Sequence, residues 1–290
     1  MKQLSLLEYA RLREPTRSDR EHIERIAADT IAELEEHAPI DLDVVASYRG
    51  INEIRLVPLP VSGCLAPAAG KITMLLNSAE SRRRRRFTGF HEVGHSFQPG
   101  YLIRTQYRCN PRTRSSRATD PETLADIAAA SLLLPEGEFC PDVHESDFGL
   151  TAIMDLAEHY DASIQASAYR YQRYWPEPTL VMVLAQGLRK EERKKPDAET
   201  KLRVVSVHAL GNWPFIPTNK SAALDGCLTR ADLGELVDEP TTLAELGVKS
   251  PPGLEVSARA LSYRAADGEP NRRVLALYRQ IGRRRREQHG

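Results

Sequence analysis

The sequence predicts a protein of the α+β class, in which helices and strands mostly occupy different stretches of the chain. Three observations support this. Apolar residues recur at helical spacing over residues 18–48 and again over 77–174, residues 51–76 contain two strand-like segments, and strand-like patterns dominate from residue 176 onward. A chain of 290 residues with 41% hydrophobic content is long enough for about two domains.

The first clear helix begins at Ser18, because Ser18 and Glu21 have the spacing of a capping box. Apolar residues then share one face as far as Leu34, at helical spacing. A shorter helix is predicted over residues 42–48 and stops at Gly50.

A small sheet is expected next. Residues 51–58 and 71–76 read as strands, and the loop between them is rich in proline, glycine and alanine. Asn77 or Ser78 can then cap a helix that runs through a cluster of arginines to Phe97.

Two further helical stretches follow. Asp120 and Pro121 open a helix with an N-cap and a proline at the first turn, where a missing N–H costs nothing. This helix is almost wholly apolar, so we expect it to be buried. Two short helices within residues 150–174 then have the outline of a helix-turn-helix.

These elements predict three regions. A helix and small-sheet domain occupies residues 1–140, a helix-turn-helix-like segment 141–175, and a mixed α/β domain 176–290. The last region contains four strand-like segments, and Asp267-Gly268 is the expected turn between the final two.

Composition excludes several classes of protein. Lysine plus arginine equals aspartate plus glutamate, 40 against 40, so the whole chain has no electrostatic reason to bind DNA or an anionic membrane. No stretch is apolar enough for a signal peptide or a membrane helix. Cys64, Cys109, Cys140 and Cys227 are widely spaced, which is typical of reduced thiols. We therefore expect a cytoplasmic protein.

The most informative motif is FHEVGH at residues 90–95. Two histidines four residues apart on a helix lie on one face about one turn apart, which suits two ligands of tetrahedral zinc. Mn²⁺ or Fe²⁺ could use similar ligands. In this motif, the glutamate after the first histidine serves as a general base. The candidates are thus His91 and His95 as ligands and Glu92 as the base.

Glu122 is the candidate third ligand, 27 residues beyond His95 on the first turn of the apolar helix. Asp126 lies four residues further and shares its face. Carboxylates on a buried helix need partners, because an isolated charge there is costly. Coordination of zinc by Glu122, and a hydrogen bond from the N–H of a ligand histidine to Asp126, would give both carboxylates a partner. Without a metal, the helix dipole would favour Glu122, and Asp126 could pair with an arginine.

With these residues in view, the chain resembles the ImmA/IrrE family of bacterial zinc metallopeptidases. The resemblance rests on RRRFTGFHEVGHSF, ETLADIAAASLLLP and the short helix pair, and covers residues 20–175. It implies a zincin-like fold, zinc on His91, His95 and Glu122, and Glu92 in the catalytic position. Ala128 stands where the family usually has an aromatic residue, and we expect this difference to leave the ligands unaffected.

The resemblance also implies a function. Members of this family act as regulatory proteases that cut helix-turn-helix repressors, often of the XRE type, and so switch on stress, phage or mobile-element genes. Residues 176–290 resemble the family only loosely, as a sensor-like domain for which a GAF-like fold is the candidate. We therefore expect a zinc-dependent endopeptidase with a protein substrate of this kind.

An alternative from another class is a non-catalytic DNA-binding or sensor regulator that keeps zinc for structure. The second helix of the pair carries Gln165, Tyr169 and Arg170, which could enter a major groove. The pair also carries Asp155 and Glu158, and the chain is neutral, so packing or substrate docking is favoured over DNA binding. A general base favours the enzyme, since a structural zinc site needs none.

The arginines at 82–86 allow two interpretations. They could contact an acidic substrate or the DNA that carries it. The favoured interpretation is a solvated helix face whose arginines pair with nearby carboxylates.

Overall fold

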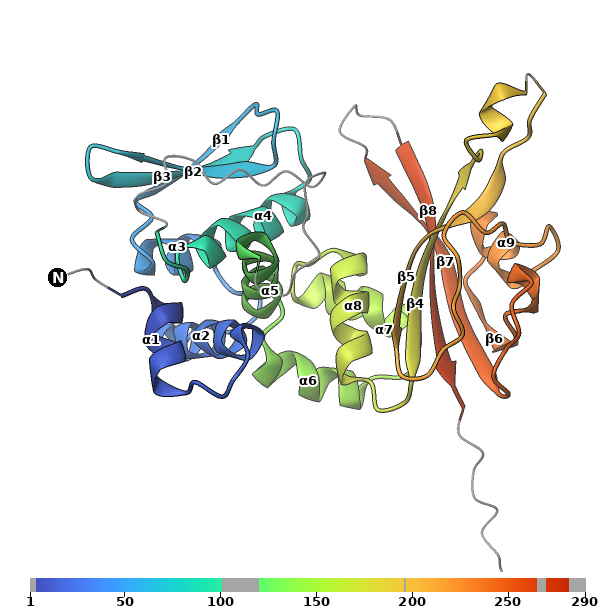
Figure 1. The fold of residues 1–290 in the computed structure, drawn as a ribbon, viewed down its shortest axis with the longest axis horizontal. Coiled ribbons are helices and arrows are strands. Elements are labelled where there is room, and N and C mark those ends of the chain that lie inside the picture. The colour runs from blue at the N-terminus through green and yellow to red at the C-terminus, as the bar shows by residue number, and fades with distance from the viewer. Residues whose placement is uncertain (1–3, 101–119, 196, 265–269, 282–290) are drawn as a thin grey trace, which may run out of the picture. The chain divides into compact units, whose positions relative to one another are not determined.

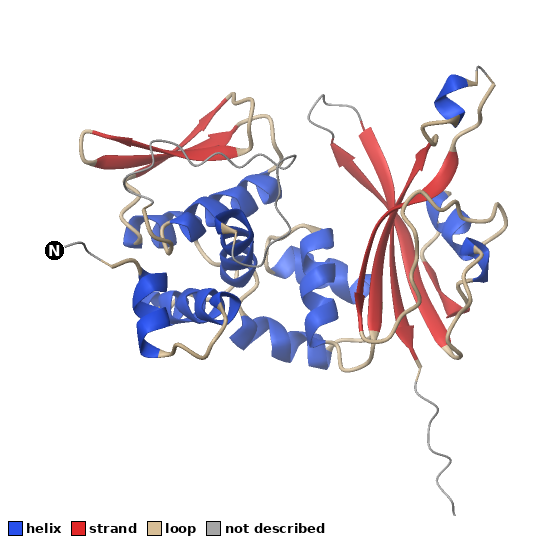
Figure 2. Cartoon of the chain, in the orientation of Figure 1, coloured by secondary structure: helices blue, strands red, loops and turns tan. Residues whose placement is uncertain are grey.

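A computed structural model of the chain describes residues 4–100, 120–195, 197–264 and 270–281. It contains helices and two β-sheets (Figures 1 and 2), which confirms the predicted α+β class. The chain divides into two compact units, Met1–Pro141 with Leu156–Ala166 and Asp142–Asp155 with Ser167–Gly290. Within the described residues, no helix is long and apolar enough to cross a membrane.

The first unit begins with three helices, α1 (Leu6–Arg13), α2 (Asp19–Leu34) and α3 (Leu42–Tyr48). Ser18 and Glu21 form the predicted capping box on α2, and α3 has the predicted bounds. The sequence did not predict α1. This helix has its own capping box of Ser5 and Glu8, but Leu7 is its only buried residue, so it lacks the apolar periodicity that marks a helix.

The small sheet has three strands, β1 (Glu53–Val57), β2 (Gly63–Ala68) and β3 (Lys71–Asn77), in the order β1-β3-β2. The expected loop between two strands was therefore wrong, because it contains β2. Pro67 argued against a strand there, but β2 lies at the sheet edge, where proline is tolerated. Ala69 and Gly70 form the tight connection to β3 with φ of 49° and 76°.

Five helices follow, α4 (Arg82–His95), α5 (Pro121–Leu133), α6 (Glu136–Glu145), α7 (Leu150–His159) and α8 (Ile164–Tyr174). The N-cap of α4 is Ser81, so the expected caps at Asn77 or Ser78 were wrong. The reason is that Asn77 still belongs to β3 and pairs with Val57. Asp120 caps α5 and Pro121 occupies its first turn, as predicted. The helix α4 packs on α5 and on the small sheet.

The second unit is built on a five-stranded antiparallel sheet, in the order β5-β4-β8-β7-β6. Its elements are β4 (Thr179–Gly187), β5 (Lys201–Leu210), α9 (Cys227–Asp232), β6 (Val237–Thr241), β7 (Leu254–Arg264), β8 (Pro270–Gln280) and the 3₁₀ turns Glu192–Lys194 and Ala244–Leu246.

The four strands predicted for this region are confirmed, whereas β6 and α9 were not predicted. The strand β6 carries Asp238, Glu239 and Pro240 and lies at the sheet edge, so it has little strand signal. The helix α9 packs on β6, β7 and β8. The expected turn at Asp267-Gly268 lies outside the described residues.

Candidate metal centre

The helix α4 carries two histidines into the interior of the first unit. Every residue from Thr88 to His95 is buried. His91 and His95 are only 1% and 0% exposed, and their ring centroids lie 4.8 Å apart in an edge-on arrangement. One helical turn separates them, so α4 presents both imidazoles side by side and shielded from bulk water.

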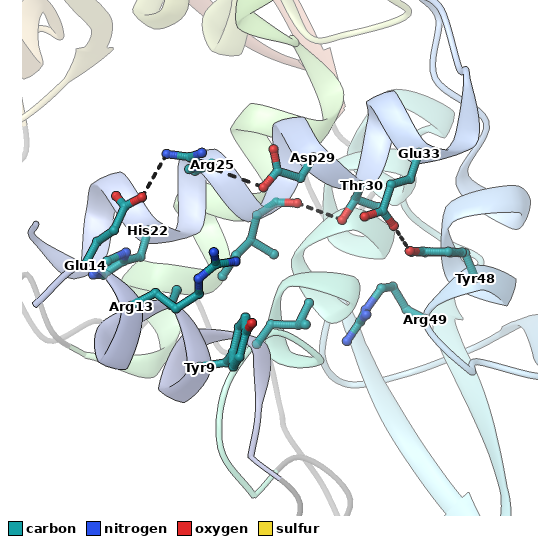
Figure 3. A pocket seen from close by; sticks show the side chains of 13 residues that line it. Tyr9, Arg13, Glu14, His22, Arg25, Asp29, Thr30, Glu33, Tyr48 and Arg49 are labelled. Carbon is teal, nitrogen blue, oxygen red and sulfur yellow. Dashed lines mark hydrogen bonds and ion pairs between the residues drawn. The ribbon is translucent and has the colours of Figure 1, made fainter.

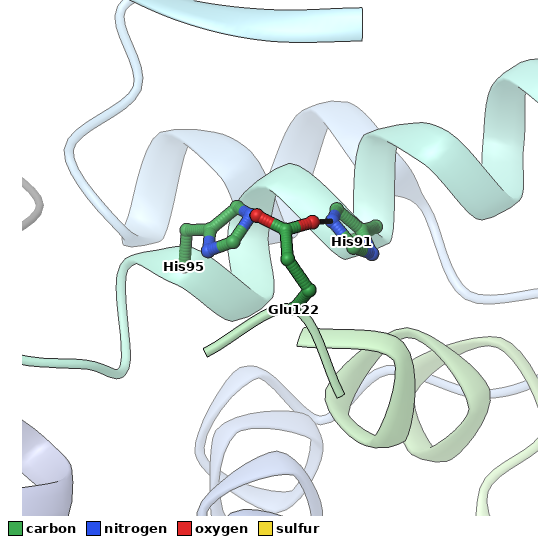
Figure 4. Close-up of side chains that lie close together, drawn as sticks. All are labelled: His91, His95 and Glu122. Carbon is green, nitrogen blue, oxygen red and sulfur yellow. Dashed lines mark ion pairs between the residues drawn. The ribbon is translucent and has the colours of Figure 1, made fainter. Parts of the chain in front are cut away.

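The first turn of α5 brings Glu122 to both histidines (Figure 4). Asp120 fixes this turn by accepting a hydrogen bond from the Glu122 N–H at 3.3 Å. One carboxylate oxygen of Glu122 lies 3.2 Å from Nε2 of His91, and the other lies 3.6 Å from Nε2 of His95. The Glu122 side chain is 34% exposed, so the cluster keeps access to solvent on this side.

The geometry of these side chains fits a zinc ion. Zn–N bonds of about 2.0–2.1 Å place the ligand atoms of a tetrahedral site about 3.3 Å apart. The separations of 3.2 and 3.6 Å are close to that value, and the candidate ligand atoms of all three residues lie within 4.8 Å of one another. Among the described residues, no other group of three potential ligands converges in this way.

Asp126 orients one of the histidines. Its Oδ1 lies 3.0 Å from Nδ1 of His91, and Asp126 is one turn beyond Glu122 on α5. A carboxylate accepts hydrogen bonds, so this contact places the ring proton of His91 on Nδ1. In the neutral ring, Nε2 of His91 is then the acceptor nitrogen, and it is the one directed at Glu122.

Glu92 is fully buried beside these groups. Its side chain is 0% exposed, and neither carboxylate oxygen has a hydrogen-bond partner within the described part of the chain. Burial raises the pKa of Glu92 to about 8, and the negative charge of Glu122 adds to the rise. A cation on the neighbouring histidines would lower this pKa again, and the resulting carboxylate, with its unused acceptor atoms, is suited to accept a proton from a bound molecule.

Close packing of α4 on α5 sets the distance between the ligands. A Cβ placed on Gly94 would lie 2.7 Å from Cβ of Ala128 and 3.0 Å from Cα of Ala125. Real Cβ atoms do not approach so closely, so only glycine permits this helix separation. Ala128 was expected to be irrelevant to the ligands. That expectation stays a prediction. The structure adds that Ala128 packs against Gly94, the residue that precedes His95.

The possible DNA-reading face of α8 is engaged in packing. Arg170 is 7% exposed, and its guanidinium lies 5.1 Å from the ring centroid of Tyr174. The ring of Tyr169 contacts the ring of His208 at 5.4 Å. These contacts favour packing over groove binding for α8. Among the described residues, Cys64, Cys140 and Cys227 form no disulfide, and Cys109 lies outside those residues.

A separate polar pocket of about 410 Å³ lies among α1, α2 and α3 (Figure 3). It contains none of the candidate ligands. Its wall includes Arg49, which donates hydrogen bonds to Oγ and to the carbonyl oxygen of Ser96 at 3.1 and 3.2 Å. Ser96 caps the C-terminal end of α4 directly after His95. These hydrogen bonds connect the C-terminal end of α3 to the C-terminal end of α4, the helix that carries both histidines.

Comparison with known proteins places this cluster within a family. Residues 65–194 match the model of the peptidase M78 family, described as the IrrE N-terminal-like domain. This segment contains His91, Glu92, His95, Glu122 and Asp126. This segment is therefore similar to the ImmA/IrrE family of metallopeptidases, as the sequence motifs predicted.

Two particular proteins are similar to the chain. The radiation response metalloprotease IrrE of Deinococcus radiodurans is 30% identical over 130 residues, which are 43% of this chain and 38% of that protein. The match thus spans less than half of the curated relative. A solved Mycobacterium tuberculosis transcriptional regulator matches 95% of this chain and 80% of its own with a TM-score of 0.59. At 13% identity, this second likeness concerns the fold alone.

Proposed function

We propose that the protein is a zinc-dependent endopeptidase of zincin-like architecture, with His91, His95 and Glu122 as ligands, Asp126 as the residue that orients His91, and Glu92 as the general base. The single observation that carries this proposal is the position of Glu92. A structural site needs only its ligands, whereas here a buried carboxylate without a hydrogen-bond partner follows the first ligand directly.

The chemistry follows from the residues. A bound zinc ion would lower the pKa of its water towards about 7 and polarise the scissile carbonyl. As general base, Glu92 would take the proton of the attacking water and pass it to the leaving amine nitrogen. Asp126 keeps the Nδ1 proton of His91 in place throughout, so Nε2 remains the ligand atom. Mn²⁺ or Fe²⁺ could occupy the same ligands.

The edge strand β2 is suited to hold a substrate chain. It pairs with β3 on one side only, so its other edge is open within the described part of the chain. A Cβ on Gly63 would lie 2.6 Å from Cγ2 of Thr88, so β2 lies directly on α4 one turn before His91. We propose that an extended substrate adds to this edge as a further strand, with its backbone held by strand-like hydrogen bonds.

The proposed substrate is a helix-turn-helix repressor of the XRE type, cleaved in the cytoplasm to derepress stress or mobile-element genes. The support is the family resemblance together with the similarity to a metalloprotease named for the radiation response. We also propose that the chain divides into three regions at residues 140 and 175, and that residues 176–290 form a sensor-like, GAF-like domain.

The test compares new protein amino termini in cells that produce the wild type or Glu92→Gln. The substitution keeps the shape of the side chain and removes the base, so zinc content should be unchanged while cleavage stops. A new terminus in a helix-turn-helix repressor, present with the wild type only, is the expected result. Identical termini with and without stress, with zinc bound to both proteins, would favour the non-catalytic DNA-binding or sensor regulator.

A further inference from the structure

The first two turns of α4 carry a run of arginines that the proposed chemistry does not use. Three of them meet one carboxylate, that of Asp161 in the turn between α7 and α8. Arg82 lies 2.6 Å from Oδ1 of Asp161, Arg83 lies 3.7 Å from the same oxygen, and Arg86 lies 3.1 Å from Oδ2. A single negative charge thus faces three positive charges.

Of the three arginines, Arg86 is the most buried, so it depends most on the negative charge of Asp161. The side chain of Arg86 is 15% exposed, its guanidinium lies 5.5 Å from the ring centroid of Phe90, and it donates a hydrogen bond to the carbonyl oxygen of Ile40 at 3.0 Å. Burial lowers the pKa of Arg86, and the charge of Asp161 opposes that effect. A buried cation without an anionic partner would be strongly destabilising, so Asp161 compensates Arg86.

The three arginines carry more positive charge than Asp161 can balance, and Arg82 and Arg83 are the more exposed of them. Their side chains are 74% and 38% exposed. Cations near a helix N-terminus are disfavoured by the helix dipole, and the first turn of α4 contains no acidic residue. Arg82 and Arg86 also stand four residues apart with like charges, which is a further cost. Asp161 supplies one negative charge for three cations, so net positive charge remains at the exposed Arg82 and Arg83.

We propose that Arg82 and Arg83 form a docking surface for an acidic segment of the protein substrate. The contact with Asp161 shows that these guanidinium groups can converge on a carboxylate, and the excess positive charge is complementary to further carboxylates. Duplex DNA fits less well, because proteins that bind it commonly make about six to ten phosphate contacts. This chain has no excess of positive charge overall.

The position of the surface predicts where the acidic segment lies. Arg83 lies nine positions before Glu92 on α4, which is two and a half helical turns, so the two side chains leave the helix on opposite sides. At about 1.5 Å per residue, the distance along the helix is about 13 Å. An extended chain covers that distance in about four residues. Because a substrate must also pass around the helix, the path is longer than this. The inference rests on the proposed peptidase function, and it places substrate carboxylates more than about four residues from the scissile bond.

The experiment measures binding, so its outcome does not depend on catalysis. Full-length, zinc-loaded Glu92→Gln protein is titrated into a fluorescein-labelled peptide of alternating glutamate and serine, with the glutamine counterpart and a labelled DNA duplex as the other probes. The same titrations use Arg82→Gln/Arg83→Gln and the matched control Arg11→Gln/Arg20→Gln. In the control, each arginine already has its own carboxylate, that of Asp19 or Glu24.

The glutamate peptide should bind more tightly than the glutamine peptide, and salt should weaken it. Arg82→Gln/Arg83→Gln should lower its affinity about 5- to 30-fold and the control less than about twofold. Circular dichroism confirms that each variant is folded. Equal losses in both variants, or duplex DNA binding tighter than the glutamate peptide, would overturn the proposal. Peptide binding without any cleavage in cells would support the docking surface and contradict the proposed peptidase function.

Discussion

Each unit of the protein has a partly buried carboxylate among other polar side chains, and the two clusters differ in their supply of donors. In the first unit, Glu122 faces the Nε2 atoms of His91 and His95. In the second unit, Glu245 accepts from the thiol of Cys227 at 2.8 Å and from the N–H of Leu228 at 3.2 Å. The carboxylate of Glu245 thus meets two donors, whereas that of Glu122 meets two imidazole nitrogens.

This difference distinguishes a metal site from a structural polar cluster. Because Asp126 faces Nδ1 of His91, the neutral ring carries its proton there, and its Nε2 is then an acceptor that cannot donate to the carboxylate at 3.2 Å. A cation between them would be coordinated by both acceptors. Glu245 needs no cation, since burial raises its pKa and two donors reach its oxygens. The predictions below test this contrast, from the largest expected effect to the smallest.

Removal of a ligand should abolish metal binding. His95→Ala deletes one of the three candidate ligand side chains, so zinc content after dialysis should fall from about one ion per chain to none. Metal analysis of purified protein measures this directly. Cys227→Ser, in the other cluster, should retain the wild-type content. Equal zinc in both variants would show that His95 is not a ligand.

Removal of the orienting carboxylate should weaken the site without abolishing it. Asp126→Asn keeps the size of the side chain but replaces the charge that faces Nδ1 of His91. Loss of such a partner typically costs about 10- to 100-fold in metal affinity. Competition titration against a zinc-binding dye gives the value, with the exposed Asp155→Asn as the control. An unchanged affinity would mean that Asp126 has no role in orienting the ligand.

A smaller effect is expected from Gly94→Ala, which acts through packing. The new Cβ would press on Ala128 and on the backbone of Ala125, so α5 must move and Glu122 with it. We expect a cost of about 1–3 kcal/mol in the free energy of unfolding, measured in urea, together with weaker zinc binding. Gly137→Ala is the matched helical control, because nothing lies within 4 Å of its Cβ position. Equal stability of the two variants would contradict the close approach.

The sequence predicted the features that follow from the spacing of residues along the chain. The HExxH spacing, the carboxylates at 122 and 126 and the four long strands all follow from local rules. It was uninformative where a contact is non-local. The closeness of Gly94 to Ala128 depends on how two helices meet, and Asp161 lies 75 residues beyond Arg86. The strands β2 and β6 carry prolines that only their edge positions explain.

The smallest effect concerns the second cluster. Burial raises the pKa of Glu245 above its ordinary value of 4.5, so the folded protein favours the neutral carboxyl. The unfolded chain ionises first as the pH rises. Ionisation therefore costs the fold stability above about pH 4.5, and this cost grows until the folded-state pKa is reached. Glu245→Gln removes the charge but keeps an oxygen for the N–H of Leu228 and an amide group that can donate to the sulfur of Cys227.

We expect the glutamine variant to match the wild type near pH 4 and to exceed it at pH 8 by about 1 kcal/mol in the free energy of unfolding. Urea denaturation at several pH values gives the difference between the two proteins. A difference that stays constant with pH, or a wild type that is the more stable protein at pH 8, would mean that the buried carboxylate is held ionised by a cation. The contrast between the two clusters would then disappear, because Glu245 would need a positive partner just as Glu122 does.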